Sequence, residues 1–394
     1  MSMTIGLAGK PNAGKSTFFK AATLADVEIA NYPFTTIHAN KGVTYVRAQC
    51  PCVTRDKRCG NCSDGIRYVP IELIDVAGLV PDAHLGRGLG NSFLDDLRQA
   101  HAIIHVIDAS GGTDIEGNPV DIGDHNPLDD IDFLNRELTM WMFSILKRNW
   151  EKLARKIQGE GLKVEHVLAD QLAGTGVDDT QVSCALNECK LDRSHHTKWT
   201  DDDLIHLCDI IRTLSKPMII AANKADVAPA ENITNLMALD QMVVPTSAAG
   251  ELALRSAAKS HAIKYEPGDK DFTIISDKLN EAQKRGLEHV RTLIQKMDGT
   301  GIQKCINQAV FELLDLIIVY PVEDEGKWTD KNGRMLPDAF LMKKGSNAHD
   351  FAYKIHSDIG DRFLYAVDAK TKMRLGEKHE LNNGDVVKIV STAK

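Results

Sequence analysis

A glycine-rich loop near the amino terminus constrains the fold of this chain more than any other feature. The loop runs from Gly9 to Ser16 and fits the phosphate-binding pattern Gly-x-x-x-x-Gly-Lys-Ser. It follows a short apolar run, Met3 to Ala8, which is typical of a buried strand, and Thr17 to Leu24 can open a helix. In a strand–loop–helix unit, backbone N–H groups of such a loop point at phosphate oxygens. The sequence therefore predicts a phosphate site at the end of its first strand.

Residues of the loop have separate expected roles. Lys15 can reach the β- and γ-phosphates of a nucleotide, and the Ser16 hydroxyl can ligate Mg²⁺. The other residues expected to surround the phosphates are Gly9, Pro11, Asn12, Ala13, Gly14 and Thr17.

A second apolar strand ends in the sequence Asp75-Val-Ala-Gly78. An Asp at the end of such a strand can hold a Mg²⁺-bound water, and the Gly78 N–H can donate a hydrogen bond to a γ-phosphate. The segment between the two motifs supplies Thr36. We expect Thr36 to complete the Mg²⁺ coordination only when a γ-phosphate is present, so its loop would respond to the state of the nucleotide.

Two later motifs point to guanine. A strand ends in Asn223-Lys224-Ala-Asp226, and a carboxylate here can accept from the N1–H and the exocyclic amine of guanine, a donor pair that adenine lacks. The stem of Lys224 can lie on the purine. Another strand runs into Ser247-Ala248, whose backbone can contact the guanine O6. Motifs in this order, at the carboxyl ends of predicted strands, indicate an open α/β sheet with a nucleotide at its carboxyl edge.

Composition narrows the class of protein. The chain has 394 residues, 43% hydrophobic and 26% charged, enough for two or three globular domains. Its net charge of −8 argues against DNA as a partner, and RNA contact would need a local basic patch. The sequence shows no signal segment and no apolar run long enough to span a bilayer. Its eight cysteines are unevenly distributed. A cytoplasmic protein with reduced thiols and no membrane contact is expected.

Three segments together resemble a known family. They read Asn-Tyr-Pro-Phe-Thr-Thr from Asn31, Asp-Val-Ala-Gly-Leu-Val from Asp75 and Gly-Leu-Gly-Asn-Ser-Phe-Leu from Gly88. This combination resembles the Obg-related translation GTPases and is most similar to the archaeal and fungal lineage of their YchF-like branch. The resemblance implies a P-loop NTPase G domain. Most YchF-like proteins have a degraded guanine motif and prefer ATP, whereas this chain keeps Asn223, Lys224 and Asp226, so we expect GTP.

Hydrolysis lacks an obvious water-orienting group. Leu79 occupies the place where many GTPases carry glutamine, so we expect slow turnover without a partner. Asn12 is one candidate for a group that assists hydrolysis, because related GTPases use an Asn at this position to hold K⁺. The alternative is that Asn12 only stabilises the loop. His105, which recurs in YchF-like chains, is a second candidate, against the alternative of a core histidine, and His84 is the fallback.

Four cysteines lie between the Thr36 loop and the Asp75 strand. Cys50 and Cys52 form one closely spaced pair, and after six intervening residues Cys59 and Cys62 form another. This spacing suits a closed tetrahedral zinc site with a structural role. The alternatives are free thiols or a redox pair.

The rest of the chain divides into an insertion and a small carboxyl-terminal domain. Residues 125–214 show helical periodicity and predict an α-helical insertion in a GTP-binding domain of residues 1–318. Residues 319–394 predict short strands and one helix, as in a β-grasp fold. The segment from Gly345 to His356 resembles the TGS domain. This resemblance implies contact with ribosomal or transfer RNA, and YchF-like chains use the helical arm to bind partners.

These observations together predict a GTP-binding and GTP-hydrolysing switch, associated with the ribosome and dependent on Mg²⁺, with K⁺ and Zn²⁺ as candidate further ions. The loops around Thr36 and Gly78 would be ordered by GTP and loosened with GDP. One alternative is an ATPase of the YchF type. The other is an RNA- or ribosome-binding adaptor in which nucleotide serves only structure.

Overall fold

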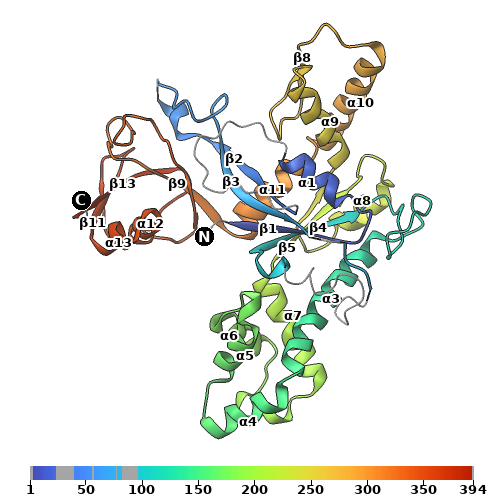
Figure 1. Ribbon diagram of the computed structural model, residues 1–394, viewed down its shortest axis with the longest axis vertical. Helices are drawn as coiled ribbons and strands as arrows, with labels where there is room; N and C mark the ends of the chain where they lie inside the picture. The colour runs from blue at the N-terminus through green and yellow to red at the C-terminus, as the bar shows by residue number, and fades with distance from the viewer. Residues whose placement is uncertain (1–2, 24–39, 56, 77, 82–95, 393–394) are drawn as a thin grey trace. The chain divides into compact units, whose positions relative to one another are not determined.

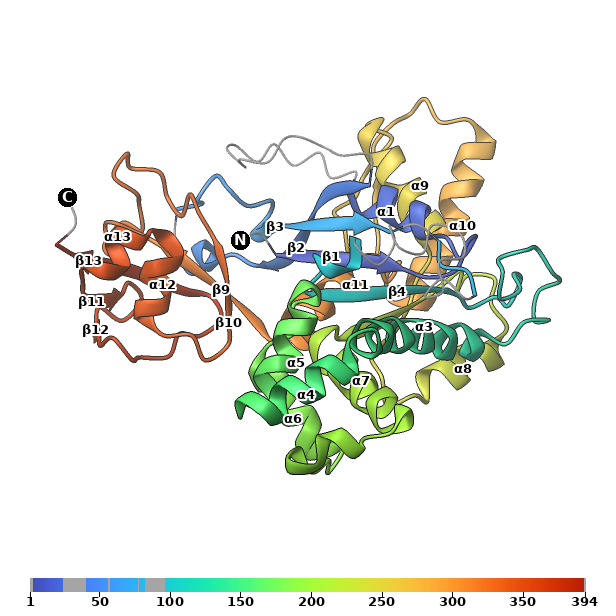
Figure 2. The same cartoon turned by 60° about the horizontal axis from the view of Figure 1, so that its bottom comes forward.

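The computed structural model describes residues 3–23, 40–55, 57–76, 78–81 and 96–392 of the chain. Contacts divide these residues into two compact units. The first unit holds residues 3–23, 40–43 and most of Glu72–Cys305, and the second holds Thr44–Ile71 and residues 306–392. Figures 1 and 2 show the chain from two sides.

A six-stranded sheet carries the nucleotide motifs. Its strands are β1 (Thr4–Ala8), β2 (Lys41–Gln49), β3 (Ile66–Asp75), β4 (Ala102–Asp108), β5 (Met218–Asn223) and β6 (Val243–Pro245), in the spatial order β2-β3-β1-β4-β5-β6. The part of β2 and β3 that lies within Thr44–Ile71 is counted with the second unit. The neighbours from β3 to β6 are parallel. The register pairs Leu7 with Asp75, Ala8 with His105 and Asp108 with Asn223. The carboxyl ends of these strands therefore meet at one edge, as the motif order predicts.

Helices and a small second sheet complete the first unit outside the insertion. The helices are α1 (Lys15–Thr23), α8 (Ala230–Met237), α9 (Ala248–Lys259), α10 (Glu281–Met297) and α11 (Ile302–Gln308), and the sheet pairs β7 (Ile263–Lys264) with β8 (Thr273–Ile274). Figure 1 places α1, α9 and α10 on one side of the six-stranded sheet.

The predicted helical insertion lies between β4 and β5. It consists of α3 (Pro127–Lys147), α4 (Trp150–Glu160), α5 (Val164–Leu172), α6 (Asp179–Glu188) and α7 (Asp201–Ser215), and these helices project from the other side of the sheet (Figure 1). One apolar cluster runs from Ile103 of β4 through Leu134 of α3 to Leu207 of α7. The insertion is thus continuous with the core of the sheet. The rings of Trp150 and Trp199 stack with centroids 5.5 Å apart, which is a packing role.

The second unit contains a five-stranded sheet with two short helices. The strands are β9 (Leu316–Pro321), β10 (Phe340–Lys343), β11 (Phe363–Asp368), β12 (Arg374–Leu375) and β13 (Asp385–Ser391), in the order β10-β9-β13-β11-β12; the helices are α12 (Ala348–Ile355) and α13 (Ser357–Asp361). Only β9 and β13 pair in parallel among these described strands. Phe351 of α12 packs among Val319 and Val387 of the sheet. This arrangement confirms the β-grasp prediction.

The local sequence explains where α12 begins. Asn347 is its N-cap, and the side-chain oxygen accepts from the N–H groups of His349 and Asp350. The Asp350 carboxylate in turn accepts a hydrogen bond from the Asn347 N–H, which completes a capping box. Among the described residues, no helix has the length and apolar character needed to cross a bilayer.

Candidate nucleotide-binding site

The glycine loop takes the shape that the phosphate pattern predicts. Gly9 and Gly14 have φ of 145° and 97°, backbone conformations that side-chain-bearing residues rarely adopt. A Cβ added at Gly9 would lie 2.2 Å from the Val106 carbonyl oxygen, and one at Gly14 would lie 2.2 Å from Asn223 Nδ2. Both positions therefore need glycine for conformation and for space. The loop leads directly into α1, whose N-terminus begins at Lys15.

Lys15 is a buried cation at the start of α1. Its side chain is 7% exposed, and Nζ donates to the Lys10 carbonyl oxygen at 2.9 Å. Burial lowers the pKa of Lys15 to about 8, and the nearby charge of Asp75 opposes that shift. A phosphate placed against Nζ would supply the missing negative charge. The environment of Lys15 is therefore suited to an anionic ligand.

Ser16 and Asp75 converge as a magnesium site would require. Ser16 Oγ donates to Asp75 Oδ2 at 3.1 Å. Asp75 Oδ1 is buried and has no hydrogen-bond partner among the described residues. Burial raises the pKa of this carboxyl, and the bond from Ser16 opposes the rise. A hydroxyl beside an unsatisfied carboxylate oxygen fits Mg²⁺, which takes one or two protein oxygens and keeps several waters. Thr36 lies outside the described residues.

Gly78 lies against the glycine loop, and Leu79 points away from it. A Cβ added at Gly78 would lie 3.0 Å from Pro11 Cγ and 3.1 Å from the Pro11 nitrogen. The Leu79 N–H donates to the Gly9 carbonyl oxygen at 3.2 Å, while its side chain is 1% exposed within the apolar core. Leu79 therefore offers no polar group to a water.

Asn223 holds two loops together at the base end of the site. Its side chain is 3% exposed, Nδ2 donates to the Ala13 carbonyl oxygen at 2.9 Å, and Oδ1 accepts from the Ala248 N–H at 3.0 Å. Both polar atoms are thus engaged with protein, and Asn223 acts as a positioning residue. Asp226 is exposed, which leaves its carboxylate accessible to a base. Ser247 caps α9 by accepting from the Gly250 N–H.

Asp108 is a residue whose role the sequence reasoning missed. Its carboxylate is fully buried at the end of β4 and accepts from Lys224 Nζ at 2.7 Å. Burial favours a raised pKa for Asp108, but donors on Lys224, Ser110 and Thr113 hold it below its usual value. Asp108 therefore orients Lys224 from the neighbouring strand. The signal in the sequence was an Asp at a strand end with no motif around it.

A buried ion pair joins the glycine loop to the insertion, and the sequence motif gave no sign of it. Lys10 Nζ lies 2.9 Å from Asp130 Oδ1, and the two side chains are 0% and 1% exposed. The same Nζ donates to the Thr113 carbonyl oxygen at 2.7 Å, and His125 Nε2 lies 2.7 Å from Asp130 Oδ1. Asp130 is in the first turn of α3. The loop is therefore anchored directly to the first helix of the insertion.

Asn12 and His105, the two candidates for a role in hydrolysis, have different surroundings. Asn12 Nδ2 donates to the Gly117 carbonyl oxygen at 3.0 Å, which stabilises the loop. His105 is 1% exposed, and burial, followed by the charges of Lys15 and Lys10, lowers its pKa to about 3. An imidazole with so low a pKa is a weak proton acceptor, and its burial fits the alternative of a core histidine. His84 lies outside the described residues.

The four predicted zinc ligands come together in the second unit. The Sγ atoms of Cys50, Cys52, Cys59 and Cys62 all lie within 4.8 Å of one another. None of these four cysteines is in a disulfide.

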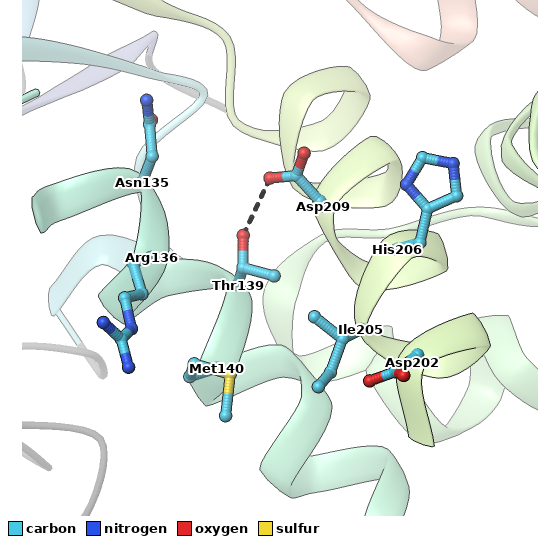
Figure 3. Close-up of a pocket in the computed structure, with 8 residues that line it drawn as sticks. All are labelled: Asn135, Arg136, Thr139, Met140, Asp202, Ile205, His206 and Asp209. Carbon is cyan, nitrogen blue, oxygen red and sulfur yellow. Dashed lines mark hydrogen bonds between the residues drawn. The ribbon is translucent and has the colours of Figure 1, made fainter. Parts of the chain in front are cut away.

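A separate pocket of about 410 Å³ lies on the insertion between α3 and α7. Figure 3 shows Thr139 Oγ1 donating to Asp209 Oδ1, a bond of 2.9 Å across the two helices. Arg212 also donates to both residues, so Thr139 and Asp209 already have partners, whereas the buried Asn135 Oδ1 has none among the described residues. The residues that line the pocket are Asn135, Arg136, Thr139, Met140, Asp202, Ile205, His206 and Asp209, and none of them belongs to a nucleotide motif.

Family models match three parts of the chain. Residues 4–131 match a model described as a 50S ribosome-binding GTPase, and residues 331–391 match the TGS domain. Residues 221–324 match the G4 motif-containing domain of the Obg-like GTPase YGR210-like family.

Whole proteins are also similar. A GTP-binding protein of Methanocaldococcus jannaschii is 52% identical over 99% of each chain, and one of Schizosaccharomyces pombe is 35% identical over 87% of this chain and 88% of that protein. The ribosome-binding ATPase YchF of Bacillus subtilis is 28% identical over 98% of each. The crystal structure of a GTP-binding protein from Pyrococcus horikoshii OT3 matches with a TM-score of 0.79 and 42% identity, covering 99% of this chain and 100% of that one.

Proposed function

Because the chain belongs to the YchF-like group of Obg-related GTP-binding proteins, we propose that it binds GTP with Mg²⁺ and hydrolyses it to GDP and phosphate. The observation that carries this proposal is the convergence of Lys15, Ser16 and the unpartnered Asp75 oxygen at the glycine loop. These groups provide the positive charge and the metal ligands that a nucleoside triphosphate needs.

The proposed hydrolysis assigns a role to each of these residues. Lys15 Nζ exchanges the Lys10 carbonyl oxygen for β- and γ-phosphate oxygens. Ser16, Thr36 and a water on Asp75 would hold Mg²⁺, which would supply positive charge to the phosphates. A water oxygen bonds to the γ-phosphorus while the bond from that phosphorus to the β–γ bridging oxygen breaks, and the water proton leaves to solvent or phosphate. Leu79 gives this water no hydrogen bond, so we expect slow turnover until a partner assists.

The proposed switch consists of the loops around Thr36 and Gly78. The Gly78 N–H would bond to the γ-phosphate, and its closeness to Pro11 supports this placement. Loss of the phosphate on hydrolysis would release both loops. For Asn12, Nδ2 is engaged with Gly117, so Oδ1 remains as the atom that would hold K⁺. The four cysteines are proposed to hold a structural Zn²⁺.

Guanine selectivity is proposed to depend on Asp226. Replacing it with Asn is expected to weaken GTP binding by about a hundredfold or more, because two hydrogen bonds to a charged acceptor are lost, at about 1.5–3 kcal/mol each. Xanthosine triphosphate should gain affinity, because an amide N–H can donate to the 2-oxo group that replaces the guanine amine. The measurement is competition against a labelled GTP analogue.

The exposed Glu231→Gln variant is a matched control for this experiment, because it removes a carboxylate a few residues downstream. It should leave both affinities unchanged. The same assay tests the ATPase alternative suggested by the B. subtilis relative. If ATP displaces the labelled analogue from the unaltered protein as well as GTP does, the guanine assignment is wrong.

We also propose a ribosome or its RNA as partner, reached through the β-grasp domain and the helical insertion. The 50S ribosome-binding GTPase model and the TGS match support this, and such a partner implies a cytoplasmic location. The protein is expected to co-sediment with ribosomes when bound to a non-hydrolysable GTP analogue, and less so with GDP. Equal sedimentation in both states, with no single-turnover hydrolysis, would instead favour an adaptor with a structural nucleotide.

A further inference from the structure

The four-cysteine cluster has the dimensions of an occupied metal site. Sulfur–sulfur distances are 3.7 Å from Cys50 to Cys59, 3.5 Å from Cys52 to Cys62 and 3.5 Å from Cys59 to Cys62. A tetrahedron with zinc–sulfur bonds of about 2.3 Å has edges of about 3.8 Å, whereas a disulfide needs about 2 Å. The separations therefore match four ligands around one ion and do not match a disulfide.

Groups around the cluster suit thiolates better than thiols. The Asn61 N–H donates to Cys59 Sγ at 3.4 Å, and a backbone donor to a metal-bound sulfur stabilises its negative charge.

Arg67 supplies a second argument from charge. Its side chain is only 6% exposed, and its hydrogen bonds within the described chain go to the carbonyl oxygens of Asn61, Leu336 and Pro337. A buried guanidinium with carbonyl acceptors alone lacks a counter-charge, which is costly. Zinc with four thiolates carries a net charge of about −2 and would provide that counter-charge.

The loop that carries the cysteines also packs on a distant segment of the same unit. Arg55 Nη2 donates to the Gly326 carbonyl oxygen at 2.8 Å, and its guanidinium lies 4.6 Å from the Trp328 ring centroid. Asn61 Nδ2 donates to the Met335 carbonyl oxygen at 3.0 Å. We name this contact between residues 50–67 and residues 323–337 the knuckle joint.

We infer that Zn²⁺ bound by the four cysteines assembles the knuckle joint, so that the metal fixes residues 323–337, next to β9 of the β-grasp sheet, onto the loop. The hydrogen-bond donors of the joint lie between or just after the cysteines, on Arg55, Asn61 and Arg67. The directions in which these side chains point therefore depend on the shape of a short polar loop. Four metal bonds would determine that shape. The inference rests on the proposed zinc site and is independent of the nucleotide.

The test combines metal analysis with hydrogen–deuterium exchange on the full chain. Freshly purified protein should contain about one zinc per chain. Removing it with a chelator should accelerate exchange at least about tenfold in residues 50–71 and in residues 323–337, and adding Zn²⁺ back should reverse both changes. Protection of the insertion helices α3 to α7 should stay constant, which shows that the protein remains folded. Binding of a labelled GTP analogue, measured in parallel, tests the proposed function separately.

A variant separates the joint from the metal. Arg55→Ala combined with Asn61→Ala should keep the zinc but accelerate exchange in residues 323–337. Arg58→Ala, an exposed arginine of the same loop, is the matched control and should behave as the unaltered protein. A metal content near zero would overturn the zinc site. Full zinc content, with unchanged exchange in residues 323–337 after chelation, would overturn the joint.

Discussion

Replacing Lys15 with methionine is expected to weaken the binding of a non-hydrolysable GTP analogue by about a hundredfold or more and to abolish measurable turnover. Methionine keeps the apolar stem of this buried side chain and removes only its charge. Two charge-assisted hydrogen bonds to phosphate oxygens are lost, worth about 1.5–3 kcal/mol each, which corresponds to a factor of about 10² to 10⁴. Titration of a fluorescent analogue measures the affinity, and phosphate release measures turnover.

The same substitution should not destabilise the nucleotide-free protein at pH 7, because burial disfavours the charged lysine there. Lys20→Met, on the exposed face of α1, is the control and should leave binding unchanged. An unaltered affinity in Lys15→Met would show that triphosphate does not occupy this loop.

Lys15 also gives a pH dependence whose sign is defined. Its pKa in the folded chain is about 8, against a usual value of 10.5. Between these values the unfolded chain holds more protons, so this residue's contribution to the free energy of unfolding rises as the pH increases from 8 to 10.5. A bound phosphate restores the charged form, so above about pH 8 binding takes up a proton and affinity falls. Both effects should be absent in Lys15→Met.

Local sequence was sufficient for the parts of the site that depend on strand ends. Residues such as Asp75 and Asn223 follow apolar runs, and parallel strands bring their carboxyl ends to one edge. The start of α12 also depends on local sequence alone, because its capping box is formed by Asn347 and Asp350, three positions apart. In each case the determining interactions lie within a few residues or follow from a single rule of topology.

Contacts between distant residues could not be read in this way. Lys10 occupies a variable position of the phosphate pattern, and Asp130 looks like an ordinary acidic residue in the first turn of a helix. The knuckle joint connects residues about 270 positions apart, such as Arg55 and Gly326. Nothing in the spacing of the cysteines indicates which carbonyl groups the loop would meet. These pairings depend on the packing of the whole unit.

Breaking the buried ion pair between Lys10 and Asp130 is the second change with a large expected effect. Lys10→Met leaves the Asp130 carboxylate buried at 1% exposure, and Asp130→Leu leaves the Lys10 ammonium buried without its counter-charge. Asp130→Leu should lower the free energy of unfolding by about 3–5 kcal/mol, because the Lys10 charge stays in a medium of low dielectric constant. Lys10→Met should cost less, because His125 still lies 2.7 Å from the Asp130 carboxylate. Urea denaturation of each variant measures the loss.

The double variant Lys10→Met with Asp130→Leu should recover most of that loss, because two apolar side chains of similar volume replace the pair and no charge remains buried. The matched control is the ion pair of Lys147 and Asp201, which joins α3 to α7 and whose side chains are about half exposed. Lys147→Met should lower the free energy of unfolding by at most about 1 kcal/mol. Additive losses in the double variant would mean that the two charges do not stabilise one another. Recovery of stability together with weakened nucleotide binding would show, in addition, that the anchoring of the glycine loop to the first turn of α3 helps to position that loop for the nucleotide.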